Sequence, residues 1–256
     1  MLPYVHSEGS GPRVLLIQGT GVAGCAWKPQ VDALSDRYEL AWYDAPGIRE
    51  RPGSPGTVAD MAADARQVLD DLGWAHAFVM GHSLGGVIAQ QLALDTPERV
   101  DGLLLLCTFA QGRAALSMNP GTLWIQTRTS IGTASMRRHA FYELVSHPDL
   151  PPTEAHIAQL EDAFGRALHA LPPAAMAQVW ALVRTDLSAR LGGLDCPAAV
   201  LSGAFDRVAP PEQGRRLAQA LGCELEVLDG GHALPVQQAD LVNVRLAAHL
   251  ARWTSM

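Results

Sequence analysis

One serine of the chain, Ser83, lies in a glycine-lined turn. Gly81 precedes it and Gly85 follows it, and the turn separates an apolar stretch, residues 77–80, from a helix-like stretch that begins at Val87. A strand that turns this sharply into a helix pushes the side chain at the turn out of the sheet edge, and small residues two positions away on either side prevent collisions. The pattern therefore makes Ser83 a candidate nucleophile.

A serine hydroxyl is a poor nucleophile at neutral pH and needs a base and an orienting carboxylate. His232 follows a strand-like stretch, residues 224–228, and Asp206 follows a buried strand-like stretch, residues 198–203. Both candidates, like Ser83, come just past the carboxyl end of a predicted strand, where open parallel sheets place their sites. The order Ser83, Asp206, His232 therefore predicts a serine–histidine–aspartate site.

Two further polar residues, Asp229 and His82, are neighbours of these candidates in the sequence. Asp229 lies three residues before His232, but its place in a local turn favours a surface role, whereas Asp206 stands at a strand end. His82 adjoins Ser83, and successive residues on a corner point apart, so a packing or loop-orienting role is expected for it. Asp206 is the expected orienting acid.

These residues resemble the motifs of the α/β-hydrolase superfamily. The matches are Gly-x-Ser-x-Gly at residues 81–85, the strand-end Asp206 with Pro210 after it, and the pair Gly231-His232. The resemblance spans residues 13–253 and weakens in the middle. It implies a nucleophile at Ser83, a general base at His232 and an orienting acid at Asp206, but a shared scaffold does not imply a substrate.

Acyl transfer also needs hydrogen-bond donors for the negative charge that develops on a carbonyl oxygen. A glycine-rich stretch, residues 19–24, follows the first clear strand and can turn backbone N–H groups inward. The expected donors are the N–H groups of Thr20 and Leu84. Members of the superfamily usually carry His-Gly at this strand end, whereas this chain has Gln18-Gly19, so the hydrogen bonding of the loop must differ in detail.

The elements that must position these residues alternate between strand and helix patterns. Strands are expected at residues 13–18, 40–43, 76–80, 102–107, 198–203 and 224–228, and helices at residues 27–34 and 57–72 and after Ser83. Such alternation predicts an α/β fold with a mostly parallel central sheet and helices on both faces. Residues 1–110 and 192–256 form the expected α/β-hydrolase core.

Residues 111–191 lack strand signals and have helix-like segments at 134–145, 153–171 and 173–187. In the superfamily such an insertion is a helical cap over the active site. Met118, Trp124 and Trp180 are candidate substrate-binding residues because they could line an apolar cavity in it. Packing between the helices is the plainer role for apolar residues at helical spacing.

Composition favours one globular catalytic unit. The chain has 256 residues, of which 48% are hydrophobic, enough to bury a large core. A formal net charge of −7 argues against nucleic acid and anionic membranes as partners. With no leader-like start and no apolar run long enough to span a bilayer, a cytoplasmic monomer or homodimer is expected. The four cysteines are widely spaced without metal-ligand spacing, so no metal site is expected. No cofactor is expected either.

The predicted function is a serine hydrolase that cleaves a small to medium, largely apolar carboxylic ester or lactone through an acyl-serine intermediate. The partner would be a small-molecule acyl substrate. Serine at position 83 sets the chain apart from the superfamily's dehalogenases and epoxide hydrolases, which carry an aspartate there.

Other functions share the same residues. The loop at residues 19–24 looks somewhat like that of carbon–carbon bond hydrolases of ring-cleavage products, and the insertion contains arginines that a dicarboxylate substrate would need. Thioesterase and cofactor-free perhydrolase activity use the same acyl-serine chemistry. A slow-turnover ligand receptor built on a hydrolase fold is the alternative from another class.

Overall fold

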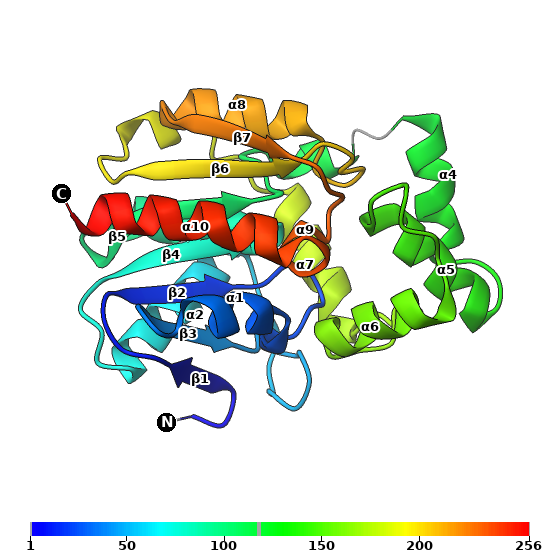
Figure 1. Cartoon of the computed structure of the whole chain (residues 1–256), viewed down its shortest axis with the longest axis horizontal. Coiled ribbons are helices and arrows are strands. Elements are labelled where there is room, and N and C mark those ends of the chain that lie inside the picture. The colour runs from blue at the N-terminus through cyan, green and yellow to red at the C-terminus, as the bar shows by residue number, and fades with distance from the viewer. Residues whose placement is uncertain (1, 117–118, 256) are drawn as a thin grey trace.

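A computed structural model describes residues 2–116 and 119–255 of the chain. In this part the strands form one seven-stranded sheet in the order β1-β3-β2-β4-β5-β6-β7 (Figure 1). The strands are β1 (Val5–Glu8), β2 (Arg13–Ile17), β3 (Glu39–Tyr43), β4 (Ala77–His82), β5 (Val100–Leu106), β6 (Ala198–Gly203) and β7 (Glu224–Leu228). Only β1 pairs antiparallel with its neighbour, so the described sheet is otherwise parallel.

Helices cover both faces of the sheet, as Figure 1 shows. The core helices are α1 (Lys28–Leu34), α2 (Val58–Asp71), α3 (Leu84–Asp95), α8 (Pro211–Leu221), α9 (Leu234–Gln237) and α10 (Ala239–Thr254). Short 3-10 turns are η1 (Gly24–Trp27), η2 (Pro97–Arg99) and η4 (Leu191–Gly193), and one more, η3 (Gly112–Leu116), follows β5 at the start of the insertion between β5 and β6. The predicted α/β fold, a mostly parallel sheet between helices, is confirmed.

The central strands are buried on both faces, which explains their continuous apolar runs. Alternate residues of one strand enter different cores: Leu103 packs with residues of α2, α3 and α8, and Leu104 packs with residues of α1 and α10. Both side chains are fully buried. This two-sided burial fixes the strand register, because a shift by one residue would exchange the two faces.

The helical insertion, residues 111–191, leaves the sheet after β5 and returns before β6. Its helices are α4 (Pro120–Arg128), α5 (Ala134–Val145), α6 (Glu154–Phe164) and α7 (Pro173–Val183). The two ends of the insertion lie together: Gln111 forms a β-bridge with Asp186, and the N–H of Leu187 donates to the carbonyl oxygen of Ala110 at 3.0 Å. In Figure 1, α4, α5 and α6 lie beyond the right-hand end of the sheet, where β4, β5 and β6 end.

Some predicted boundaries are wrong. The helix expected at residues 153–171 ends as α6 at Phe164, because Gly165 takes the left-handed conformation with φ of 66°. The helix expected at 173–187 ends at Val183. The helix expected at 57–72 agrees with α2 to within one residue at each end, and Thr57 caps it through a capping box with Asp60.

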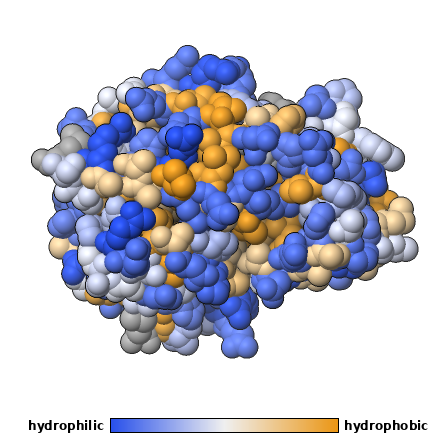
Figure 2. All heavy atoms as spheres, in the orientation of Figure 1, coloured by the Kyte–Doolittle hydropathy of each residue, from blue (hydrophilic) through white to orange (hydrophobic). Residues whose placement is uncertain are grey.

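The surface in the orientation of Figure 1 is hydrophilic over most of its margin (Figure 2). Hydrophobic residues gather toward the middle of this face, where the sheet layer meets the insertion. None of the helices in the described ranges, 2–116 and 119–255, combines the length and the hydrophobicity needed to cross a membrane.

Candidate active site

Ser83 occupies the sharp turn between β4 and α3. Its φ of 55° and ψ of −120° are strained for a residue with a side chain. The turn closes only because its flanks are glycines: a β carbon on Gly81 would collide with the carbonyl oxygen of Gly85, and one on Gly85 would collide with that of Ile17. The backbone of Ser83 is fixed as well, since its carbonyl oxygen accepts from Oγ1 of Thr108 at 2.6 Å.

A chain of two hydrogen bonds joins the three residues that the sequence singles out. Nε2 of His232 lies 3.0 Å from Oγ of Ser83, and Nδ1 of His232 lies 2.8 Å from Oδ2 of Asp206. All three are buried, and the side chain of Asp206 is fully enclosed. The structure thus brings together a hydroxyl, an imidazole and a carboxylate from three strand ends, in the geometry that activates a serine.

The loop after β6 holds the carboxylate of Asp206. Its Oδ1 accepts hydrogen bonds from the N–H groups of Val208 and Ala209, at 2.8 and 2.7 Å, which leaves Oδ2 for His232. Next in the chain, the guanidinium of Arg207 donates to the carbonyl oxygen of Glu143 in α5. The acid-bearing loop is therefore tied to the insertion.

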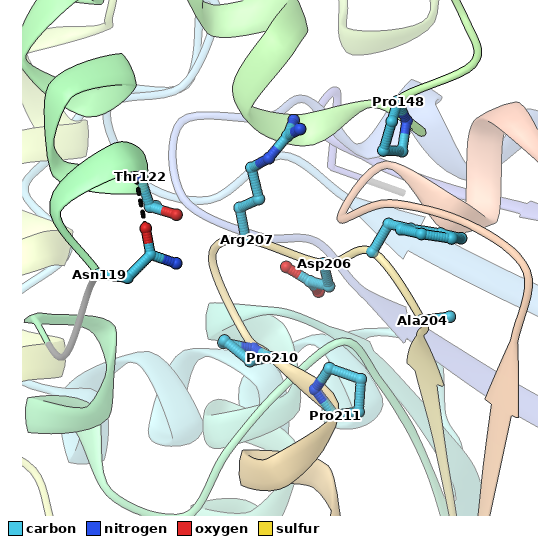
Figure 3. A pocket seen from close by; sticks show the side chains of 9 residues that line it. Asn119, Thr122, Pro148, Ala204, Asp206, Arg207, Pro210 and Pro211 are labelled. Atoms are coloured by element: carbon cyan, nitrogen blue, oxygen red, sulfur yellow. Dashed lines mark hydrogen bonds between the residues drawn. The ribbon is translucent and has the colours of Figure 1, made fainter.

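A cavity of about 300 Å³ lies beside this loop (Figure 3). Its lining residues are Asn119, Thr122, Pro148, Ala204, Phe205, Asp206, Arg207, Pro210 and Pro211. The N–H of Thr122 donates to Oδ1 of Asn119 at 2.9 Å at the start of α4. The cavity thus separates the start of the insertion from the loop that carries the acid.

Asp229, the other carboxylate near His232 in sequence, lies elsewhere. Its side chain is 76% exposed, and its Oδ1 lies 3.2 Å from Nε2 of His147. The N–H of Asp149 donates to Nδ1 of His147 at 3.0 Å, so Nε2 carries the proton and donates to Asp229. Asp206, and not Asp229, is the partner of His232 in the structure.

The glycine-rich loop after β2 lies against Ser83. A β carbon on Gly19 would sit 3.0 Å from Cβ of Ser83. Leu84 is the first residue of α3, so its N–H has no partner within the helix. No acceptor in residues 2–116 and 119–255 takes the N–H of Thr20. The two N–H groups expected to hold an oxyanion are therefore both available as donors, while Gln18 uses its side chain to accept from the N–H of Gly19.

Comparison with known proteins decides the family. A sequence profile described as the alpha/beta hydrolase fold matches residues 12–238. The chain belongs to the α/β-hydrolase family. A protein of Variovorax paradoxus named "Putative carbamate hydrolase RutD" is 32% identical to this hydrolase, over 97% of the chain and 95% of the relative.

Two solved structures share the fold of the hydrolase. The enol-lactonase of Burkholderia xenovorans LB400 superposes with a TM-score of 0.81 at 25% identity, over 97% of this chain and 96% of that one. A thermophilic esterase of Thermogutta terrifontis superposes with a TM-score of 0.77 at 25% identity, over 97% and 93%.

His82 lies directly behind the site of this hydrolase. Its Nε2 lies 2.9 Å from the carbonyl oxygen of His232, and the two rings are tilted with centroids 5.0 Å apart. Burial, with the nearby His232 next in effect, lowers the pKa of His82 to about 3. His82 is therefore neutral at physiological pH and donates through Nε2. Its sequence position indicated only a packing or loop-orienting role.

Three potential metal ligands lie close together, since nitrogens of His82 and His232 and the sulfur of Cys107 are all within 4.8 Å of one another. Hydrogen bonds to Ser83 and Asp206 already occupy both nitrogens of His232, and a bond to the backbone occupies Nε2 of His82. Burial, with the negative charge of Asp206 next in effect, raises the pKa of the Cys107 thiol, which disfavours the thiolate that would ligate a metal. The geometry favours the hydrogen-bonded arrangement.

The two candidate substrate-binding tryptophans of the insertion are largely exposed. Trp124 is 65% exposed on α4. Trp180 is 56% exposed on α7, where it lines a groove with Thr57 of the α2 start, and Arg184 lies over its ring at 5.8 Å. Met118 lies outside the described residues. Both tryptophans thus lie on the surface of the insertion.

Two other side chains of the insertion, those of Gln178 and Arg166, contact the loop after β2. Gln178 and Arg166 both bond the peptide groups of Gly21. No sequence pattern distinguishes Arg166 from the other arginines of the insertion or singles out Gln178. Both contacts join positions more than a hundred residues apart.

Proposed function

We propose that the protein is a serine hydrolase that cleaves small to medium, largely apolar carboxylic esters or lactones. The observation that carries the proposal is the hydrogen-bonded chain from Ser83 through His232 to Asp206, which lies next to two available N–H donors. A hydroxyl with an adjacent base, and a base with its own orienting acid, form the arrangement used for nucleophilic attack on acyl carbon.

In the proposed mechanism, Oγ of Ser83 attacks the carbonyl carbon of the substrate while Nε2 of His232 takes the hydroxyl proton. The N–H groups of Thr20 and Leu84 stabilise the oxyanion that forms. His232 then donates its proton to the alkoxide oxygen as the acyl C–O bond breaks, which leaves an acyl-serine. The alcohol of an ester departs, whereas the new hydroxyl of a lactone stays on the acyl group. A water molecule repeats the sequence, with His232 as base, and releases the carboxylic acid.

Asp206 serves this cycle without changing its own charge. It accepts the hydrogen bond from Nδ1 of His232, which keeps Nε2 free to accept the serine proton. The two backbone bonds to Oδ1 hold the carboxylate in place while the imidazole gains and loses its charge. Asp206 thus orients the base and stabilises the imidazolium.

The names of two solved relatives support an ester or lactone as substrate, because an esterase and an enol-lactonase share the fold at 25% identity.

We propose further that the insertion acts as a cap over the site. The buried side chains of Val22 and Ala233, from loops beside the site, pack in one cluster with Phe164 of α6.

A carbamate is the second candidate substrate class. The name of the Variovorax relative motivates it, at 32% identity over nearly the whole chain. A carbamate presents the same acyl carbon, with a nitrogen that weakens its electrophilicity, so the same serine attack would depend more strongly on the oxyanion donors.

The test is steady-state hydrolysis of p-nitrophenyl esters from acetate to decanoate, with p-nitrophenyl carbamate alongside. The proposal expects multiple turnovers that peak at one acyl length and vanish in Ser83→Ala. Ser10→Ala makes the same change at an exposed position and should match the wild type. Equal activity in wild type and Ser83→Ala, or none in either, would contradict the proposal. A carbamate rate above every ester rate would favour the second candidate.

A further inference from the structure

Gly21, in the loop after β2, packs against the start of α7 in the insertion. A β carbon at this position would sit 3.1 Å from Cβ of Ala175 and 3.4 Å from Cδ of Pro172, both at the start of α7. The φ of Gly21 is +66°, which glycine adopts without strain. The loop that carries Thr20 therefore contacts the start of α7 at Gly21, where the backbone has a left-handed conformation.

Gln178 accepts a hydrogen bond from the backbone N–H of Gly21. The N–H of Gly21 donates to Oε1 of Gln178 at 2.8 Å, and Gln178 is only 2% exposed on α7. This N–H belongs to the peptide group between Thr20 and Gly21. A buried hydrogen bond from α7 thus fixes the peptide plane that follows the Thr20 α carbon.

Arg166 bonds the backbone carbonyl group of Gly21. Its Nε donates to the carbonyl oxygen of Gly21 at 2.8 Å, while Nη1 donates to the carbonyl oxygens of Ala167 and Ala170 at 3.0 and 3.2 Å. The guanidinium also lies over the ring of Phe141, 4.9 Å from its centroid. Burial lowers the pKa of Arg166 to about 10, so the side chain remains a charged donor at neutral pH.

A third bond strengthens the same connection, because the N–H of Ala23 donates to the carbonyl oxygen of Phe164 at the end of α6. On the core side, Oδ1 of Asp44 accepts from the N–H of Gly24 at 2.7 Å, beyond the segment that carries Thr20. Two consecutive peptide planes after Thr20 are therefore held by side chains of the insertion.

We propose that Gln178 and Arg166 are positioning residues that make the oxyanion site depend on a docked insertion. They hold Gly21 by its N–H and by its C=O, and so aim the N–H of Thr20 toward Ser83. This inference rests on the proposed serine hydrolase function. An oxyanion donor contributes mainly in the transition state, so its misplacement lowers kcat and leaves KM little changed.

The experiment compares two variants of nearly equal size at Gln178, using the best p-nitrophenyl ester. Gln178→Met removes the acceptor, and we expect kcat to fall by about 10- to 100-fold with KM within about twofold of wild type. Gln178→Glu keeps an acceptor oxygen for the N–H of Gly21 and should retain kcat to within about threefold. Gln159→Met makes the same change at an exposed position of α6 and is the matched control.

A second measurement separates positioning from general loosening of the fold. An alkyl boronic acid bound to Ser83 places an oxygen among the oxyanion donors, whereas the carboxylic acid product does not need them. Gln178→Met should weaken inhibition by the boronic acid in proportion to its loss in kcat and leave inhibition by the product acid unchanged. Arg166→Met removes the donor to the Gly21 carbonyl and should show the same split, which keeps the inference testable if Gln178→Met does not fold.

The outcomes distinguish the two proposals. Wild-type turnover that depends on Ser83, together with an unchanged kcat in folded Gln178→Met and Arg166→Met, would overturn the positioning role and leave the hydrolase function standing. A raised KM with unchanged kcat would also overturn it, since Gln178 would then contact the substrate. A wild type without Ser83-dependent turnover would overturn both.

Discussion

Nε2 of His82 donates a hydrogen bond to the carbonyl oxygen of His232 at 2.9 Å, within the buried layer behind Ser83. The bond fixes the backbone from which the His232 ring projects toward Oγ of Ser83. Because burial lowers the pKa of His82 to about 3, this donor stays neutral while His232 exchanges protons in front of it. A neutral donor adds no repulsion when His232 becomes an imidazolium.

His82 should make the protein less stable in acid. The unfolded chain takes up a proton at this residue below its ordinary pKa of 6.5, whereas the folded chain does so only near 3. The free energy of unfolding should therefore fall as the pH drops from 6.5 toward 3, by about 1.4 kcal/mol per pH unit from this residue. Urea unfolding of wild type and His82→Gln at pH 7 and pH 4.5 tests this.

His82→Gln keeps an N–H donor but does not titrate, so the wild type should lose about 2–3 kcal/mol more than the variant between these two pH values. A parallel decline in both proteins would show that the His82 ring accepts a proton in the folded state.

The two aspartates near His232 should differ sharply in their effect on catalysis. Asp206→Asn removes the charge opposite Nδ1 of His232 and allows the wrong tautomer, so kcat should fall about 10³-fold or more. Asp229→Asn alters an exposed carboxylate that bonds His147, and kcat should stay within about twofold of wild type. Comparable losses in both variants would mean that the acid role is shared.

The sequence was sufficient to bring Ser83, Asp206 and His232 to one edge of the sheet. Each of them follows a short apolar strand, and the carboxyl ends of parallel strands lie along a single edge whatever the packing details. The glycines around Ser83 further specify a turn that only a strand-to-helix corner requires. Local patterns predict these features because local sterics produce them.

Contacts with the insertion could not be predicted in this way. Gln178 is a polar residue within an apolar helix, and its partner Gly21 becomes visible only when α7 docks on the loop after β2. The exposed Trp180 shows the opposite case, since an aromatic residue on the same helix points to a surface groove. Periodicity indicates which residues share a helix face, but the docking of the helix decides which face meets the site.

Gly19 should tolerate no side chain, although its φ is ordinary. In Gly19→Ala the new β carbon would lie 3.0 Å from Cβ of Ser83 and 3.4 Å from Nδ1 of His82. Since the Ser83 backbone is held by Thr108, the loop must move away from the site, and kcat should fall about 10- to 100-fold. Gly193→Ala, at a position where a β carbon meets no atom within 4 Å, is the control and should leave kcat unchanged.

Gly165 and Gly222 end helices α6 and α8 in the same way, each with φ of 66°. An alanine in this left-handed conformation costs about 1 kcal/mol at either site. Only at Gly165 does the new β carbon also meet neighbours, Cβ of Ala23 and Sγ of Cys25, each at 3.0 Å. At Gly222 no atom lies within 4 Å.

Gly222→Ala should therefore lower the free energy of unfolding by about 1 kcal/mol and leave activity unchanged. Gly165→Ala should cost about 1–3 kcal/mol more, because α6 and the loop after β2 must separate by a few tenths of an ångström. The same separation strains the bond from the N–H of Ala23 to the carbonyl oxygen of Phe164, so kcat should fall as well. Urea unfolding and ester hydrolysis measured on both variants test this, and equal behaviour of the two would show that α6 does not support the loop beside Ser83.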